Sequence, residues 1–184
     1  MSLRPKQAAL ATVFEEYGIK RGEFTLASGR TSQWYLDGRQ VTFRGDCVHL
    51  VGDAVMEAIE AGGGCHFDSC GGLAVGAIPV GLAVGLASGR PSFAVRKEAK
   101  GHGVGGRMAG PVVPTDHVLV VEDTATSGGS IIEAIDALEE FGCTVVGASV
   151  LLDRGGELGA ILEARSIAYF PVLGAPDVGF EFGS

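Results

Sequence analysis

Short apolar runs alternate with amphipathic helical patterns along most of the chain. Continuous apolar runs are typical of strands buried on both faces of a parallel sheet, whereas apolar residues that recur every three or four positions indicate helices. Strands are expected at residues 66–70, 92–95, 118–121, 144–152 and 166–172. Helices are expected at about 10–17, 46–61 and 130–141. Two more are expected, one directly after a turn at 71–77 and a short one around Ile161 and Leu162. This alternation predicts a single α/β domain with a mostly parallel twisted sheet and helices on both faces.

Capping residues define the ends of the second helix. Asp46 is its expected N-cap, and the glycines at 62–64 end it. A glycine-rich turn at residues 71–77 follows the strand expected at 66–70, and it leads into a helix that has Pro79 in its first turn. Such a turn lets backbone amides approach a ligand closely.

The stretch from residue 118 to residue 141 carries unusual chemistry. After the apolar strand 118–121, Glu122 and Asp123 stand side by side. Two adjacent carboxylates after a buried strand need polar partners, so a ligand with hydroxyl groups or cations explains them better than packing does. The next loop is rich in hydroxyl groups and glycine, and the following helix begins near Ser130. The loop amides and the positive end of this helix form a candidate anion site.

This strand, acid pair and Thr/Ser/Gly loop resemble the phosphoribosyl pyrophosphate (PRPP) motif of the type I phosphoribosyltransferases. The resemblance implies that the two acids hold the 2′ and 3′ hydroxyls of the ribose and that the loop holds its 5′-phosphate. The PRPP-binding residues implied here are Glu122, Asp123, Thr124, Ala125, Thr126, Ser127, Gly128, Gly129 and Ser130. The alternative is an ordinary turn between strand and helix whose acids face solvent.

A basic, glycine-rich segment runs from Arg96 to Arg107. It holds four of the 14 Lys and Arg residues of an acidic chain, which indicates a mobile cationic loop for a multiply charged anion. A solvated surface loop is the alternative. The sequence R-K-x-x-K-x-H-G resembles the flexible catalytic loop of orotate phosphoribosyltransferases, here about residues 96–110. The resemblance implies that Lys100 is catalytic, together with Asp123, and that PRPP also contacts Arg96, Lys97, Lys100 and His102.

The same segment contains the glycine spacing of a dinucleotide-binding fingerprint, at Gly101, Gly103 and Gly106. Such a fingerprint must follow a strand and open a helix. Residues 107–114 contain a further glycine and two prolines and show no helical period. Dinucleotide binding is therefore rejected.

The segment F-T-L-x-S-G-R at residues 24–30 is typical of a β-hairpin with an aromatic face, and it also resembles the N-terminal hood of orotate phosphoribosyltransferases. The resemblance implies a small hood, mainly residues 1–45, that closes over the pyrimidine and PRPP. Many members of the family have a lysine at the position of Ala27 and another in the turn at 71–77, and this chain has neither. Neutralisation of pyrophosphate is therefore expected to depend on Mg²⁺ and on the basic loop.

Asp153 and Arg154 follow the strand at 144–152, at the end where ligands bind in open α/β sheets. The resemblance implies that Arg154 binds the carboxylate of orotate and that Thr126 helps to position this substrate. Alternatively, Arg154 pairs with Asp153 or Glu157 at the protein surface.

The composition is that of a globular protein, with 46% hydrophobic and 20% charged residues among 184. The net charge of −8 argues against a nucleic-acid partner. No apolar run is long enough to span a membrane, and residues 1–7 lack the apolar core of a signal peptide. The four cysteines show no paired spacing, which favours reduced thiols and a cytoplasmic location. Cys65, His66 and Cys70 are a weak candidate for a metal site, because a second ligand pair is lacking.

The hood, the basic loop, the PRPP motif and the Asp-Arg turn together cover most of the chain. The resemblance therefore implies an orotate phosphoribosyltransferase, a pentosyltransferase that joins orotate to PRPP to give orotidine 5′-monophosphate and pyrophosphate in the de novo synthesis of UMP. It also implies a Mg²⁺ cofactor, held mainly by PRPP and water, and a homodimer with shared active sites. The alternatives are a phosphoribosyltransferase for another nucleobase and a non-enzymatic PRPP-sensing regulator of the same fold.

Overall fold

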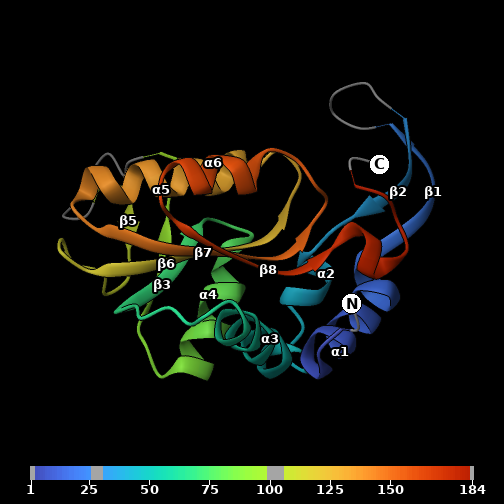
Figure 1. The fold of residues 1–184 in the computed structure, drawn as a ribbon, viewed down its shortest axis with the longest axis horizontal. Helices are drawn as coiled ribbons and strands as arrows, with labels where there is room; N and C mark the ends of the chain where they lie inside the picture. The colour runs from blue at the N-terminus through green and yellow to red at the C-terminus, as the bar shows by residue number, and fades with distance from the viewer. Residues whose placement is uncertain (1–2, 26–30, 99–105, 183–184) are drawn as a thin grey trace.

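A six-stranded sheet forms the centre of the computed structural model, which describes residues 3–25, 31–98 and 106–182 (Figure 1). The strand order is β5-β4-β3-β6-β7-β8, and all neighbours are parallel except β5, which is antiparallel to β4. The strands of this sheet are β3 (Ser69–Leu73), β4 (Ser92–Val95), β5 (Met108–Ala109), β6 (His117–Ala125), β7 (Thr144–Asp153) and β8 (Ala168–Gly174). The mostly parallel α/β architecture expected from the sequence is confirmed.

Helices cover both faces of this sheet (Figure 1). The helical elements of the described residues are α1 (Pro5–Val13), the π-helical turn η1 (Phe14–Gly18), α2 (Arg39–Thr42), α3 (Val48–Ala61), α4 (Ala77–Ser88), α5 (Gly129–Phe141), α6 (Leu158–Ala164) and the 3₁₀ turn η2 (Ala175–Val178). One face of the sheet carries α5 and α6, and the other carries α3 and α4. Leu119 and Val121 of β6 pack in the core beside α3 and α4, whereas Val118 and Val120 pack in the core beside α5. Burial on both faces explains why this part of β6 is uniformly apolar.

A separate β-hairpin lies at one end of the molecule, beside the C-terminal segment (Figure 1). Its strands, β1 (Ile19–Thr25) and β2 (Thr31–Leu36), are antiparallel. Trp34 of β2 is buried in the core. The hairpin expected from the sequence is confirmed by the pairing of β1 with β2, while residues 26–30, including Ala27, lie outside the described residues.

Several boundaries agree with the sequence prediction. The strand expected at 92–95 is β4 without change, and the strand expected at 144–152 is β7 with one further residue. The first helical segment ends at Gly18, as expected, after its final π-helical turn. The short helix expected around Ile161 is α6.

The prediction of a strand at 66–70 is wrong by three residues, because β3 begins at Ser69 and ends at Leu73. Gly71 and Gly72 therefore belong to the strand and not to the turn that follows it. A Cβ atom on Gly71 would lie 2.2 Å from the carbonyl oxygen of Phe93 in β4. A Cβ atom on Gly72 would lie 2.1 Å from the carbonyl oxygen of Val121 in β6. The two glycines are thus needed for the close approach of β3 to both neighbouring strands.

Two further boundaries differ from the prediction. The N-cap of α3 is Cys47, while the carboxylate of Asp46, the expected N-cap, pairs with the guanidinium of Arg44 at 2.7 Å. The last strand, β8, begins later than expected because Ser166 has a φ of 58°, a left-handed conformation that does not continue a strand.

The segment after the rejected dinucleotide fingerprint is a turn followed by β5, not a helix. Gly106 lies in this turn, whereas Gly101 and Gly103 lie outside the described residues. None of the helices in the described ranges combines the length and the apolar character that crossing a bilayer requires.

Candidate active site

Two acidic side chains lie near the carboxyl end of β6, in the middle of the sheet. The prediction that Glu122 and Asp123 follow the strand is wrong, because β6 stays paired with β7 beyond them. Glu122 lies opposite Val150, and the pairing continues to Ala125, opposite Asp153. The strand therefore holds both carboxylates in the interior, where Glu122 is 5% exposed and Asp123 is 8% exposed.

Burial is the largest cause of the pKa shifts of both members of this acid pair. Burial, followed by the charge of Asp123, raises the pKa of Glu122 to about 8. Burial also raises the pKa of Asp123, although its Oδ1 accepts a hydrogen bond of 2.8 Å from the backbone N–H of Thr124. Neighbouring carboxyl groups with raised pKa values are typical of ligand-binding and catalytic sites.

Two chain segments close against the acid pair, each through a glycine. A Cβ atom on Gly38, at the exit of the hairpin, would lie 2.7 Å from Oδ2 of Asp123. A Cβ atom on Gly76, before α4, would lie 2.9 Å from Oδ1 of Asp123 and 2.9 Å from Oε1 of Glu122. The absence of a side chain at both positions lets these segments form walls beside the carboxylates.

The walls and the acid pair enclose a cleft of about 290 Å³. Among the described residues, its cations are Arg39 and Lys97. Nε of Arg39 lies 2.8 Å from Oδ1 of Asp37, and the charge of Arg39 opposes the rise in the pKa of Asp123. The residues that line the cleft are Leu36, Asp37, Gly38, Arg39, Leu73, Ala74, Val75, Gly76, Lys97, Glu122, Asp123, Thr124 and Ser130.

A second cavity of about 320 Å³ adjoins this cleft, since Glu122, Thr124 and Ser130 line both. It lies within the loop that joins β6 to α5. The N-cap of α5 is Gly128, whose φ of 77° is readily adopted only by glycine. The positive end of α5 and the polar loop face this cavity, an arrangement that suits a phosphate group. The residues that line it are Glu122, Thr124, Ala125, Thr126, Ser127, Gly128, Gly129, Ser130 and Ile131.

The basic loop is anchored at both of its described ends. Nη1 of Arg96 donates a hydrogen bond of 3.0 Å to the carbonyl oxygen of Met108. Nη2 of Arg107 lies 2.5 Å from Oε1 of Glu133 in α5. These contacts fix the base of the loop to β5 and to the helix that begins at the second cavity.

The loop cations predicted to bind PRPP have different positions. Lys97 lines the cleft, whereas the guanidinium of Arg96 contacts the base of the loop. Lys100 and His102 lie outside the described residues.

The two residues predicted to bind orotate, Thr126 and Arg154, come from adjacent loops. The backbone N–H of Arg154 donates a hydrogen bond of 2.8 Å to the carbonyl oxygen of Ala125. A Cβ atom on Gly156 would lie 2.2 Å from the carbonyl oxygen of Thr126, which shows how closely the loops approach. Arg154 is 8% exposed, so it does not lie at the surface as the alternative interpretation required. The carboxylate of Asp153 accepts a hydrogen bond of 2.7 Å from Oη of Tyr169.

Sequence reasoning missed the contribution of the hairpin exit to the cleft. Asp37, Gly38 and Arg39 reach the acid pair from a distant part of the chain. The signal available in the sequence was a glycine between an acid and an arginine, directly after an aromatic strand. This signal is weak, because the same residues also occur in exposed turns.

Comparison with known proteins places these features in a family. The model of the phosphoribosyl transferase domain matches residues 72–166. The chain is 39% identical over 177 residues to the orotate phosphoribosyltransferase of Corynebacterium glutamicum, covering 95% of each chain. It is 36% identical over 179 residues to that of Mycobacterium tuberculosis, covering 96% of this chain and 98% of the relative.

The fold agrees with this assignment. The crystal structure of Mycobacterium tuberculosis orotate phosphoribosyltransferase in complex with PRPP has a TM-score of 0.81 to this structure at 34% sequence identity. The match covers 96% of this chain and 100% of that chain. The expected type I phosphoribosyltransferase fold is thereby confirmed, and the chain belongs to the orotate phosphoribosyltransferase family.

Proposed function

We propose that this enzyme transfers the ribose 5-phosphate group of PRPP to orotate, giving orotidine 5′-monophosphate and pyrophosphate in pyrimidine biosynthesis. The observation that carries the proposal is the buried acid pair between an anion-binding cavity and a cleft with cations. PRPP has a ribose in the middle, a phosphate on one side and a pyrophosphate on the other. This order matches the acid pair in the middle, the anion-binding cavity on one side and the cleft with cations on the other. The PRPP complex of the Mycobacterium tuberculosis relative supports the same choice of ligand.

The acid pair is proposed to bind the ribose ring. The carboxylates of Glu122 and Asp123 accept hydrogen bonds from the 2′ and 3′ hydroxyls, which favours their ionised form. Displacement at C1′ develops positive charge on the ring, and buried carboxylates stabilise such charge more strongly than water does. The 5′-phosphate accepts hydrogen bonds from residues 124–130 at the positive end of α5.

Cations are needed for the departing pyrophosphate, and the described part of the cleft supplies Arg39 and Lys97. Lys100, Arg96 and His102 of the basic loop are proposed to join them when the loop closes over PRPP. A cation that meets charge growing in the transition state acts on turnover more than on binding.

Mg²⁺ is proposed as the cofactor. Mg²⁺ usually keeps waters and substrate phosphates as ligands, so the ion is proposed to be held mainly by PRPP and water. The described residues contain no group of three or more His, Cys, Asp or Glu side chains that could hold it alone, and the carboxylates of Asp37, Glu122 and Asp123 line the cleft beside it. When bound with PRPP, the ion neutralises charge on the pyrophosphate. These carboxylates would orient its water ligands.

Orotate is proposed to lie between the two adjacent loops that carry Thr126 and Arg154. The planar guanidinium of Arg154 matches the geometry of a carboxylate in two parallel hydrogen bonds. The hydroxyl of Thr126, on the loop that binds the 5′-phosphate, would fix orotate relative to C1′ of the ribose. Both contacts together discriminate orotate from bases that lack a carboxylate.

A homodimer with shared active sites is proposed as the working state. The helix α4 is apolar around its circumference, and Leu82 and Leu86, one turn apart, are each 58% exposed. An exposed apolar face of this kind is typical of a protein interface. A second copy of the chain is the proposed occupant, because α4 starts at Gly76 in the wall of the cleft and a partner on α4 would lie beside the site.

A cytoplasmic location is also proposed. The four cysteines, Cys47, Cys65, Cys70 and Cys143, are free thiols. Burial is the main cause that raises the pKa of each thiol, and it raises that of Cys70 to about 12. Unreactive free thiols are typical of proteins from reducing compartments.

The proposal is tested by incubating the enzyme with PRPP, Mg²⁺ and orotate and following the ultraviolet absorbance of the base. Parallel reactions contain uracil, hypoxanthine or adenine. We expect consumption of orotate alone, with one pyrophosphate released per orotate consumed. Consumption of another base instead of orotate would assign a different phosphoribosyltransferase. Binding of PRPP without turnover of any base would indicate a regulator.

A further inference from the structure

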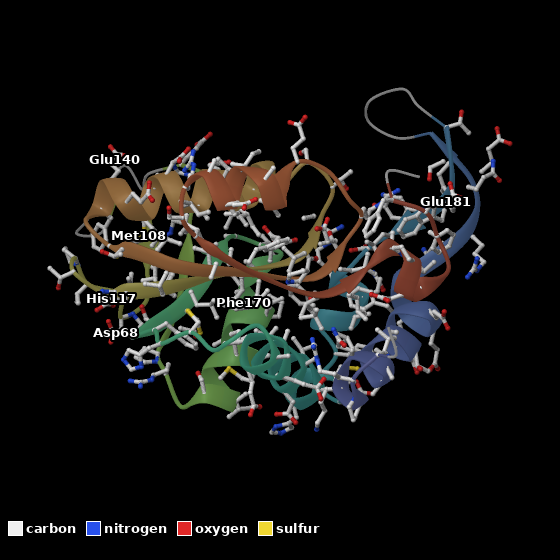
Figure 2. The ribbon with its side chains drawn as sticks, viewed as in Figure 1. Asp68, Met108, His117, Glu140, Phe170 and Glu181 are labelled. Atoms are coloured by element: carbon white, nitrogen blue, oxygen red, sulfur yellow. The ribbon has the colours of Figure 1, made fainter. Side chains whose placement is uncertain are left out.

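Four side chains from three parts of the chain form one stack. The ring centroids of Trp34 in β2 and Phe180 near the C-terminus lie 4.1 Å apart, with an angle of 6° between the planes. Cζ of Arg154 lies 4.1 Å from the centroid of the Trp34 ring, and Cζ of Arg21 lies 4.6 Å from that of Phe180. Figure 2 shows the C-terminal segment, labelled at Glu181, beside the hairpin that carries Trp34.

The two neighbours of Trp34 must occupy opposite faces of its indole ring. One face has no room for both the Phe180 ring and the Arg154 guanidinium at these distances. Trp34 is accordingly 1% exposed. The order of the stack is therefore Arg21, Phe180, Trp34 and Arg154.

The C-terminal segment also contacts the turn that carries Arg154. A Cβ atom on Gly155 would lie 2.5 Å from Cδ1 of Phe182, and one on Gly174 would lie 3.0 Å from Cζ of Phe182. The φ of 86° at Gly155 is a left-handed conformation that turns the chain sharply after Arg154. The hairpin and the C-terminal segment thus meet at the residue assigned to orotate.

We propose that Trp34 and Phe180 are positioning residues for orotate, because they hold the guanidinium of Arg154 in a fixed plane. A guanidinium that stacks by its face on an aromatic ring forms hydrogen bonds through its edge, in its own plane. The side chain has then already lost conformational entropy before the substrate binds, so binding costs less. Phe180 fixes the plane of Trp34, and Trp34 fixes the plane of Arg154. The inference rests on the proposed role of Arg154, and it makes orotate recognition depend on the C-terminal segment.

Trp34 is the only tryptophan of the chain, so intrinsic fluorescence reports the stack directly. Phe180→Ala removes the stacked ring, Phe180→Tyr keeps it, and Phe43→Ala removes an exposed phenylalanine outside the stack. We expect Phe180→Ala to change the Trp34 emission and to raise the KM for orotate about tenfold, with kcat and the KM for PRPP nearly unchanged. Phe180→Tyr and Phe43→Ala should behave like the unchanged enzyme.

Arg154→Ala separates this inference from the proposed function. The positioning role alone would be overturned by the following pair of results. The KM for orotate rises in Arg154→Ala, but it is unchanged in Phe180→Ala although the Trp34 emission of that variant is altered. An unchanged orotate KM in Arg154→Ala would remove both assignments. Equal rises in the KM of both substrates in Phe180→Ala would show a merely structural role. Should Phe180→Ala not fold, Phe180→Leu, which fills space without a planar ring, provides the same comparison.

Discussion

Glu122 and Asp123 lie where they can bind a ligand, but their burial lowers the stability of the protein without ligand. Burial and the neighbouring charge raise the pKa of Glu122 from 4.5 to about 8. The folded state therefore binds this proton more tightly than the unfolded state does. The resulting contribution to stability is fully present below pH 4.5 and is lost as the pH rises through about 8.

Glu122→Gln should therefore stabilise the protein without ligand. The amide cannot ionise, so the free energy of unfolding at about pH 8.5 should rise by about 1–3 kcal/mol, with a smaller gain at about pH 5. Urea unfolding at both pH values measures the difference. Glu163→Gln, at an exposed position of α6, is the matched control and should change neither value. A Glu122→Gln variant that is less stable at the higher pH would contradict the argument.

The residues of the site differ in how far the sequence reveals them. The PRPP motif is contiguous, so its acids, hydroxyl groups and glycines could be recognised together. Arg39 reaches the same cleft only through the fold, and no local pattern links it to Asp123. The stacking of Arg154 on Trp34 was equally hidden, because it depends on where the hairpin docks.

Among the elements, the bounds of β4 and β7 were predicted closely, whereas those of β3 and β6 were not. The four residues of β4 and the apolar run of β7 matched the structure closely. In β3 and β6, glycines and acids break the pattern although the backbone pairing continues past them. The extent of a parallel strand is set by its partners, and Gly72 lies in β3 because β6 approaches it closely.

Gly38 provides a test of how the hairpin exit meets the sheet. Its φ of −60° suits any residue. Gly38→Ala therefore adds no backbone strain and tests only whether a methyl group fits beside the acid pair. The new methyl group would meet Asp123 Oδ2 and the side chain of Thr124, and we expect the KM for PRPP to rise about tenfold. Gly45→Ala, where no atom lies within 4 Å of the added carbon, is the matched control. Steady-state kinetics that show equal behaviour of the two variants would refute this contact.

The basic loop should act chiefly on the chemical step. Lys100→Ala is expected to lower kcat about 10²-fold or more while weakening PRPP binding far less, because its cation meets charge that grows as pyrophosphate leaves. Single-turnover kinetics together with a PRPP binding titration separate the two effects. An unchanged kcat would remove Lys100 from the mechanism.

At the scale of the whole molecule, the position of the basic loop bears on the assembly. The loop joins β4 to β5 at one edge of the sheet, while the acid pair lies on β6, with β3 in between. Lys97 at the start of the loop lines the cleft, but Lys100 and His102 lie further along the chain. If the proposed homodimer shares its active sites, we expect Lys100 of one copy to serve the acid pair of the other.

Subunit mixing tests this arrangement. Lys100→Ala and Asp123→Asn chains, each almost inactive alone, are unfolded together and refolded so that subunits exchange. If the loops cross, the Lys100→Ala chain in a mixed dimer keeps its own Asp123 and receives an intact Lys100 from its partner. One site of each mixed dimer is then complete, and the other carries both lesions.

Random pairing gives mixed dimers in about half of the population, so activity should recover to about a quarter of that of the unchanged enzyme. Mixing Lys100→Ala with the double variant Lys100→Ala/Asp123→Asn is the matched control, because neither chain then carries Lys100. If each loop closes over its own subunit, every site in a mixed dimer keeps one lesion. Activity that stays at the level of the separate variants would therefore show that the sites are not shared.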